Sequence, residues 1–248
     1  MAEIPILFSA PMVRAILAGR KSQTRRALKP QPQARGDFHI KGDDGLPTST
    51  WRPEIGWDAT KRAFGFRMQC GCCLNQFHKL RWAPGDSLWV RETLTVNGDG
   101  LEYAADGEIC HNLFDADTNA EAATELWNRR AHIDGPDLHP TAVPSIHMPR
   151  WASRITLDVT DVRVERLQAI SDADALAEGI YWSEDFEGYC SGRGPDETVD
   201  FHGSDPVRSF EKLWDAINGM TSPNGWDANP WVAAITFQRV SIGSAVNG

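Results

Sequence analysis

The chain has 248 residues, 41% of them hydrophobic, and carries a formal net charge of −9. This length allows one large domain or two small ones with a core that needs no disulfides, and the negative charge argues against non-specific coating of nucleic acid, which relies on many Lys and Arg contacts to phosphates. Because the sequence shows neither an apolar run of about 18 residues nor a secretion pattern at its N-terminus, we expect no membrane partner and a cytoplasmic location.

The N-terminal stretch predicts a strand, a short helix and a second strand. Residues 4–8 form an apolar run that suits a strand. Ser9 can cap the following helix, and Pro11 is tolerated in its first turn. Gly19 is a plausible end for this helix, because glycine adopts the left-handed conformation without a Cβ clash. Residues 24–28 then return as a strand.

A basic segment, RKSQTRR at 20–26, directly follows Gly19. It contains four cations, namely Arg20, Lys21, Arg25 and Arg26. A lysine three residues before a threonine can activate the hydroxyl or hold an anion, and here Lys21 precedes Thr24. The alternative is a solvated basic turn on an acidic protein. Local positive charge on an acidic body suits a small anionic or nucleotide-like ligand better than a long duplex.

The next region combines a loop-rich excursion with a cysteine turn. Residues 29–60 are rich in Pro, Gly, Asp and Ser and are expected outside the core, whereas 63–68 can form a strand. The five cysteines are an odd number and do not form a disulfide framework. Thiolates and imidazoles suit zinc, and the candidate ligands are Cys70, Cys72, Cys73 and His78, with Cys110 and His111 as the only second pair. The alternative is a set of reduced loop thiols.

The central segment APGDSLWVRET, at 83–93, predicts a turn followed by a buried strand. Pro84-Gly85-Asp86 has turn chemistry. The strand covers 88–90 and is expected to lead outward to Arg91 and Glu92. Residues 101–105 alternate in polarity and are expected to pair with it. Residues 119–130 have helical composition within a surface insertion.

The C-terminal half predicts one long strand, two helices and a closing strand. Residues 155–164 alternate strictly, as in a half-exposed strand. Ser171 and Asp174 resemble a capping box for a helix that ends near Glu178 and Gly179. Asp205-Pro206 begins the clearest helix; its expected apolar face is Phe210, Leu213, Trp214 and Ile217. The closing strand covers 231–240. In total we expect about six strands and three or four short helices in one α+β domain built on a small mixed β-barrel.

Several of these segments together resemble the ASCH family, whose fold is related to the RNA-binding PUA domain. They are ILAGRKSQTRR (16–26), APGDSLWVRET (83–93), residues 155–180, SFEKLWDAI (209–217) and PWVAAITFQRV (230–240). SIHMPRWASR (145–154) and NGWDANPWV (224–232) are similar to signatures of the long ASCH proteins of phages and prophages. The resemblance covers about half of the chain. It implies a PUA-like domain over 1–248, with insertions at about 29–80, 107–143 and 181–204.

The resemblance also implies a chemistry. Some small bacterial ASCH proteins are amidohydrolases that remove acyl groups from the exocyclic amine of cytidine, using a Lys, a Thr three residues later and a downstream Glu. The matching residues here are Lys21, Thr24 and Glu178, although Asp172 and Asp174 lie on the same short helix as Glu178. Lys21 would take the proton of the Thr24 hydroxyl if its pKa is depressed, and Glu178 would orient Lys21 or shuttle a proton.

Further residues are predicted to contact a substrate. Arg20, Arg25 and Arg26 would depress the Lys21 pKa or bind anions, and Arg26 is the candidate for oxyanion stabilisation. The other candidates are Trp89, Arg91, Glu92, Tyr103, Arg150 and Trp151, since aromatic and Arg planes stack on unpaired bases. Trp89 and Trp214 are nevertheless expected in the core, and His147 as a hydrogen-bonded structural histidine.

Three functions remain open from the sequence. The first is the amidohydrolase acting on a modified nucleoside. The second is a non-catalytic reader of RNA or of a modified base, and the third is a nuclease acting on single-stranded RNA, an activity also attributed to some family members. None of these three functions requires a cofactor. Zinc bound at the cysteine turn is the one cofactor that the sequence leaves open. The oligomeric state is left open.

Overall fold

The computed structural model describes residues 2–31, 51–58, 63–68, 76–114, 117–130, 132–134, 137–139, 142–192 and 202–240. For 51–58, 63–68, 76–78, 130, 132–134, 137–139 and 202, only the backbone is described. The α+β class is confirmed, since α-helices and several β-sheets occur together. The described residues contain seventeen strands, far more than the six expected, because many are hairpin strands of two to four residues.

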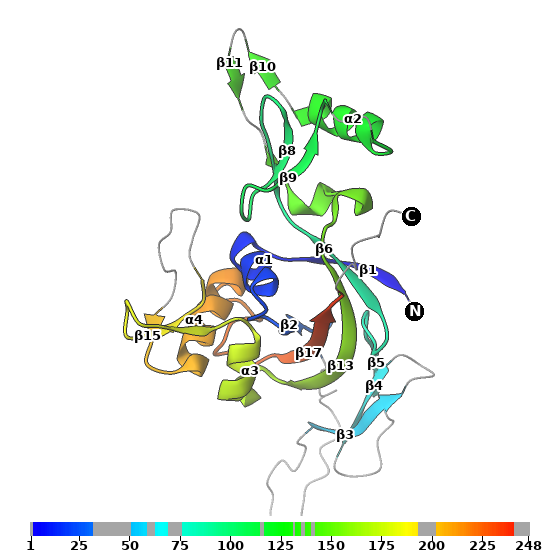
Figure 1. Cartoon of the computed structure of the whole chain (residues 1–248). Helices are drawn as coiled ribbons and strands as arrows, with labels where there is room; N and C mark the ends of the chain where they lie inside the picture. The colour runs from blue at the N-terminus through cyan, green and yellow to red at the C-terminus, as the bar shows by residue number, and fades with distance from the viewer. Residues whose placement is uncertain are drawn as a thin grey trace, which may run out of the picture.

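A five-stranded sheet forms the main body of the molecule (Figure 1). Its strands, in spatial order, are β1 (Glu3–Leu7), β6 (Ser87–Arg91), β13 (Thr156–Arg166), β17 (Trp231–Arg239) and β2 (Gln23–Ala27). Only the β1–β6 pair is parallel. The order places β1 and β2 at the edges, and the Arg26 guanidinium spans from β2 to the end of β1 by donating to the Leu7 carbonyl at 2.6 Å.

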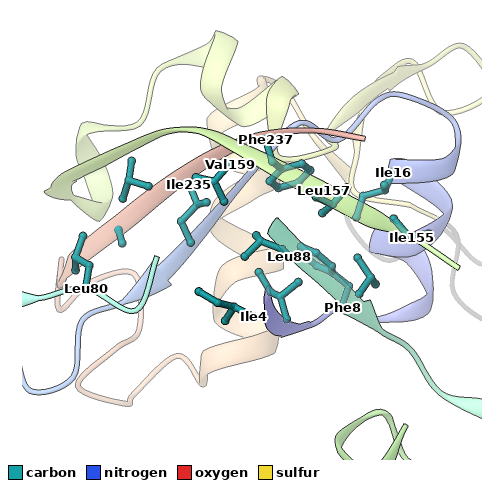
Figure 2. Packing of buried hydrophobic residues seen from close by; sticks show 14 of the residues in the cluster. Ile4, Phe8, Ile16, Leu80, Leu88, Ile155, Leu157, Val159, Ile235 and Phe237 are labelled. Carbon is teal, nitrogen blue, oxygen red and sulfur yellow. The ribbon is translucent and has the colours of Figure 1, made fainter. Parts of the chain in front are cut away.

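The main hydrophobic core lies on the inner face of this sheet. Strand alternation directs Ile4, Leu88, Leu157 and Ile235 to the same face, and Figure 2 shows these side chains packed together. Helix α1 (Ala10–Leu17) adds Ile16 to the same cluster. Burying each such side chain contributes roughly 1.5–3 kcal/mol to the stability of the fold. The face of the sheet that carries these apolar residues is therefore the one that is covered.

The two ends of α1 differ in how well they follow the sequence prediction. Ser9 occupies the N-cap position, but its side chain makes no capping hydrogen bond. Gly19 follows the helix with a φ of +71°, the left-handed conformation expected of it. The chain therefore turns sharply after α1 and brings the basic segment back along the sheet as β2.

A second sheet packs with α2 (Ala120–Arg130), next to the main body in Figure 1. Its order is β12 (Ala142–Val143), β7 (Leu94–Val96), β8 (Gly100–Tyr103) and β9 (Ile109–Asn112). The prediction that 101–105 pair with 88–90 is wrong, because β8 pairs with β7 and β9. The nearest partner along the chain is the short strand β7, and sequential strands tend to pair.

Three smaller sheets lie in segments that the sequence marks as loop-rich. They are β3 (Trp51–Asp58), β4 (Ala63–Met68) and β5 (Gln76–Lys79); β10 (His132–Asp134) and β11 (Asp137–His139); and β14 (Tyr181–Ser183), β15 (Gly188–Cys190) and β16 (His202–Gly203). The strand predicted at 63–68 is confirmed as β4, whereas 51–58, expected as part of an excursion, also form a strand. Three 3₁₀ turns cover Ser145–His147, Arg150–Ala152 and Leu167–Ala169.

Helices α3 (Asp172–Ala177) and α4 (Pro206–Asn218) have the predicted caps. The Ser171 hydroxyl accepts from the Asp174 backbone N–H at 3.2 Å, and Asp205 accepts from the Arg208 N–H at 2.7 Å. The helix α3 contacts both β2 and α4, so the two helices flank the β2 edge of the main sheet.

No helix among the described residues is long and apolar enough to cross a membrane.

Candidate active site

The basic segment and the end of α3 meet through backbone contacts. Lys21 and Glu178 form an isolated antiparallel bridge, and the Ser22 N–H donates to the Ala177 carbonyl at 2.9 Å. Gly179 makes this approach feasible: its φ is +103°, and a Cβ there would lie 3.4 Å from Lys21 Cβ and 3.3 Å from Ala15 Cβ. The backbone bridge and the positive φ of Gly179 therefore place Lys21 directly opposite Glu178.

The side chains of Lys21 and Glu178 form a buried ion pair. Lys21 Nζ lies 2.8 Å from Glu178 Oε2 and also donates to the Glu178 carbonyl at 2.7 Å. The exposed fractions of the two side chains are 0% and 4%. A pair so completely removed from water is held strongly, because the low local dielectric strengthens the attraction of opposite charges.

Arg25 connects this pair to two further carboxylates. Its Nη1 lies 3.1 Å from Glu178 Oε1, and its Nη2 lies 2.7 Å from Glu165 Oε1 and 3.3 Å from Asp174 Oδ2. We call Lys21, Arg25, Glu165, Asp174 and Glu178 the buried ion cluster. The role of Arg25 that the geometry favours is to orient carboxylates, and its predicted role as an anion contact has no support from these contacts, because its Nη groups already face protein oxygens.

Electrostatics within the buried ion cluster perturb two titrating groups. Burial lowers the pKa of the Lys21 ammonium, the Glu178 carboxylate opposes this shift, and the charges of Arg26 and Arg25 add to it. Burial acts to raise the pKa of Asp174, but hydrogen bonding by Arg163 and the charge of Arg25 outweigh it and bring this pKa to about 2. The cluster therefore holds the Asp174 carboxylate ionised and favours a lysine that releases its proton more readily than usual.

A pocket with a cavity volume of about 60 Å³ opens beside the buried ion cluster. Its lining comprises Met12, Thr24, Arg25, Arg26, Ala27, Glu178, Phe210, Leu213, Trp214, Ile217 and Asn218. Thr24 and Glu178 thus share one pocket, and the ammonium of Lys21 lies against the carboxylate of Glu178. A hydroxyl and a carboxylate therefore line this recess, and the buried Lys21 amine, which is not part of the lining, contacts the carboxylate. These are the types of group that nucleophilic acyl chemistry uses.

Arg26 forms the wall of the pocket next to β1. Its guanidinium carbon lies 5.5 Å from the centre of the Phe8 ring, and Lys21 Nζ lies 5.8 Å from the same ring. While Nη2 is bound to the Leu7 carbonyl, Arg26 Nε has no hydrogen-bond partner among the residues that the structure describes. Arg26 therefore carries a buried N–H without a partner in the described residues and also lines the pocket.

Four of the other predicted contact residues lie outside this pocket. The guanidinium of Arg20 stacks on Tyr181 at 4.5 Å. Arg91 and Arg150 lie over the Trp89 ring at 4.6 and 5.8 Å, and Arg91 Nη1 donates to the Ile146 carbonyl at 3.1 Å. Trp89 is 8% exposed and Trp214 is 5% exposed, which confirms the expectation that both are core residues.

The prediction that Glu92 leads outward from β6 is wrong. Glu92 is 1% exposed and forms a two-pronged ion pair with Arg154, at 3.0 and 2.9 Å. Arg154 also stacks on Tyr103 at 3.8 Å, while the Tyr103 hydroxyl donates to the Ala152 carbonyl at 2.9 Å. Trp151 packs against the hydrophobic cluster that contains Tyr103 and Ala152. The polar groups of Glu92 and Tyr103 therefore have protein partners, and neither residue lines the pocket beside the buried ion cluster.

Only some of the candidate zinc ligands lie among the residues that the structure describes. Cys70, Cys72 and Cys73 lie outside the described residues, and His78 is described by its backbone in β5 alone. Cys110 is partly exposed, and His111 Nδ1 lies 3.6 Å from Asp117 Oδ2. Within the described ranges, no group of three or more His, Cys, Asp or Glu residues is placed to hold a metal ion.

Two parts of the site were not predicted from the sequence. Gln23 and Glu165 bind Arg25, at 2.6 and 2.7 Å; the alternation along β13 could have indicated that Glu165 faces its neighbour strand. The apolar wall formed by Met12 and α4 was also missed, because nothing in the local pattern of α4 indicates what its apolar face covers.

In comparisons with known proteins, the chain matches no protein-family model, no curated protein and no solved structure.

Proposed function

We propose that the protein is an amidohydrolase of the ASCH type, which removes an acyl group from the exocyclic amine of a cytidine-type modified nucleoside. In this proposal the curved five-stranded sheet, whose edges Arg26 links, is a PUA-like barrel. The single observation that carries the proposal is the 2.8 Å pair of Lys21 and Glu178, buried beside a pocket that Thr24 lines. These are the three residues that the family resemblance selects.

The hydrogen bonds of Lys21 suit a general base. A neutral amine has two N–H groups and one lone pair, and Lys21 Nζ already makes two short contacts, to the carbonyl and to Oε2 of Glu178. If the neutral amine donates both of its N–H groups there, its remaining tetrahedral position is the lone pair. In the proposed mechanism this lone pair accepts the Thr24 proton, and the lowered pKa of Lys21 favours the neutral form.

The reaction then proceeds in two stages. In the first, the Thr24 oxygen attacks the acyl carbonyl as Lys21 takes the hydroxyl proton, and the Arg26 Nε–H stabilises the oxyanion. Cleavage of the carbon–nitrogen bond passes that proton from Lys21 to the departing amine and leaves an ester on Thr24. In the second stage, water attacks the ester with Lys21 as base, and the products are a carboxylate and the regenerated Thr24 hydroxyl.

The experiment is to incubate the folded protein with N4-acetylcytidine and to measure cytidine release by chromatography. We expect release from the wild-type chain and almost none from Thr24→Ala. The matched control is Ser22→Ala, which removes an exposed hydroxyl two residues away and should retain activity. No release from any of a broad panel of acylated bases would refute the proposal.

The same samples distinguish the alternative functions. A protein that releases nothing but is stabilised thermally by nucleosides or RNA would instead be a reader of RNA or of a modified base. Cleavage of labelled single-stranded RNA that persists in a chelator would identify a nuclease, in which Lys21 and an arginine stabilise the charged phosphorus centre. The buried ion cluster favours the amidohydrolase, because phosphate binding needs cations that are open to the ligand, and the Lys21 and Arg25 side chains are both fully buried.

A further inference from the structure

The pocket beside the buried ion cluster has one charged wall and one apolar wall. Thr24, Arg25, Arg26 and Glu178 line the first. The second consists of Met12 from α1 together with Phe210, Leu213, Trp214 and Ile217 from α4. The Trp214 indole N–H is already bound to the Asn224 carbonyl at 2.7 Å, so these side chains offer carbon surface to a ligand. Asn218, the last residue of α4, is the polar member of this wall, and its amide donates to the Trp214 carbonyl at 3.0 Å.

The pocket encloses too little space for a whole nucleoside. Its cavity volume is about 60 Å³, whereas pockets that bury a drug-sized ligand measure roughly 300–1,000 Å³. Only a fragment of a few heavy atoms fits inside, so the rest of a substrate must lie at the mouth. Ile217 marks that mouth, because it lines the pocket and is also 52% exposed.

We infer that this pocket is the acyl-group subsite and that it selects a short, apolar acyl chain. The inference rests on the proposed amidohydrolase function. With the carbonyl carbon held at Thr24, the alkyl chain extends along the α4 wall, and the amine with its nucleoside points out of the mouth. The enzyme is therefore selective for the acyl group and tolerant of what carries the amine.

The test compares kcat/KM for N4-acetyl-, N4-propanoyl-, N4-butanoyl- and N4-decanoylcytidine. Each methylene buried against the apolar wall should raise kcat/KM by about fourfold, so the butanoyl compound, with two more methylenes, should exceed the acetyl compound by roughly sixteenfold. The decanoyl chain outgrows the pocket and should be cleaved poorly. Replacing N4-acetylcytidine by N4-acetylcytosine removes the ribose and should change kcat/KM by less than about threefold.

Ile217→Trp provides the decisive variant, because it fills the mouth at a position that is already half exposed. It should lower the ratio of butanoyl to acetyl kcat/KM by about tenfold. The matched control is Ile146→Trp, at a residue that is 56% exposed and absent from the pocket lining; it should leave the ratio unchanged. Far-ultraviolet circular dichroism and the melting temperature verify that both variants fold.

The outcomes separate this inference from the proposed function. If acetyl- and butanoylcytidine are both cleaved but their ratio is the same in Ile217→Trp as in wild type, the acyl-subsite inference is overturned while the amidohydrolase stands. A dependence on the ribose far stronger than the dependence on the acyl chain would also overturn it. If the folded wild-type chain cleaves no acylated base, the proposed function fails, and the inference with it.

Discussion

Glu178→Gln measures how much the buried ion cluster contributes to the free energy of unfolding. The substitution keeps the size of the side chain but removes the negative charge that faces both Lys21 and Arg25. Arg25 retains Glu165 and Asp174 as partners, whereas Lys21 has no other carboxylate among its contacts in the described residues. The variant therefore leaves an ammonium whose side chain is 0% exposed without a carboxylate facing it.

The geometry sets the expected size of the effect. At an effective dielectric constant near 20, unit charges separated by the 2.8 Å between Lys21 Nζ and Glu178 Oε2 attract by about 6 kcal/mol. Desolvation offsets part of this attraction, and removing one partner of a buried pair typically costs about 3–5 kcal/mol. For a chain of this size, the loss corresponds to a fall in melting temperature of roughly 6–20 °C.

The assay is urea denaturation followed by tryptophan fluorescence at several pH values. In the variant, the folded state binds the Lys21 proton more weakly than the unfolded chain does, because burial lowers the Lys21 pKa and Glu178 no longer opposes the shift. The free energy of unfolding of Glu178→Gln should therefore fall as the pH drops from about 10, until Lys21 is protonated in both states. It should fall further than that of wild type, because the Lys21 pKa is lowered less where Glu178 opposes the shift.

The control is Glu211→Gln, which removes the carboxylate of an exposed pair with Arg208 on α4. Exposed pairs contribute about 0–1 kcal/mol. If Glu178→Gln costs no more than this control, or if its cost does not grow as the pH is lowered, then Lys21 and Glu178 are not the desolvated pair described above, and the argument for a lysine of lowered pKa is refuted.

Three further perturbations follow from the structure. Thr24→Ala should reduce kcat for N4-acetylcytidine by on the order of 10³ or more while leaving the melting temperature within a few degrees of wild type; a retained kcat would exclude Thr24 as the nucleophile. Gly179→Ala should destabilise the fold by about 1–3 kcal/mol, because φ is +103° and the new Cβ would meet Ala15 and Lys21; urea denaturation would show it, and a neutral result would contradict the strain. Asp205→Ala removes the α4 cap and should cost about 1 kcal/mol; an unchanged denaturation midpoint would show that the cap contributes nothing.

Much of the fold follows from local sequence signals. The first strand, α1, β13, α3, α4 and β17 were all predicted near their observed bounds, because periodicity, caps and glycines act over a few residues. Pairing over long distances was less predictable. Residues 101–105 were assigned to the wrong partner strand, and 51–58 were expected as loop, because neither pairing leaves a mark in the strand's own sequence.

The candidate site divides in the same way. Lys21, Thr24 and Glu178 were selected by resemblance, and Lys21 and Glu178 do meet, with Thr24 in the same pocket. In contrast, Glu92 was expected to face outward and is buried by Arg154. Ile217 was assigned only to the apolar face of its helix, and the structure leaves it half exposed where it lines the pocket. The surroundings of both residues come from distant parts of the chain.

The sequence alone determined the α+β class, the caps and ends of the helices, and the basic segment after Gly19, because each depends on the conformational preferences of neighbouring residues. Only the tertiary structure decided that Glu178 faces Lys21, that Arg25 is enclosed by carboxylates, and that α4 gives the pocket an apolar wall. The physical reason is that burial and charge pairing depend on which segments meet in space, and Lys21 and Glu178 are 157 residues apart in the chain.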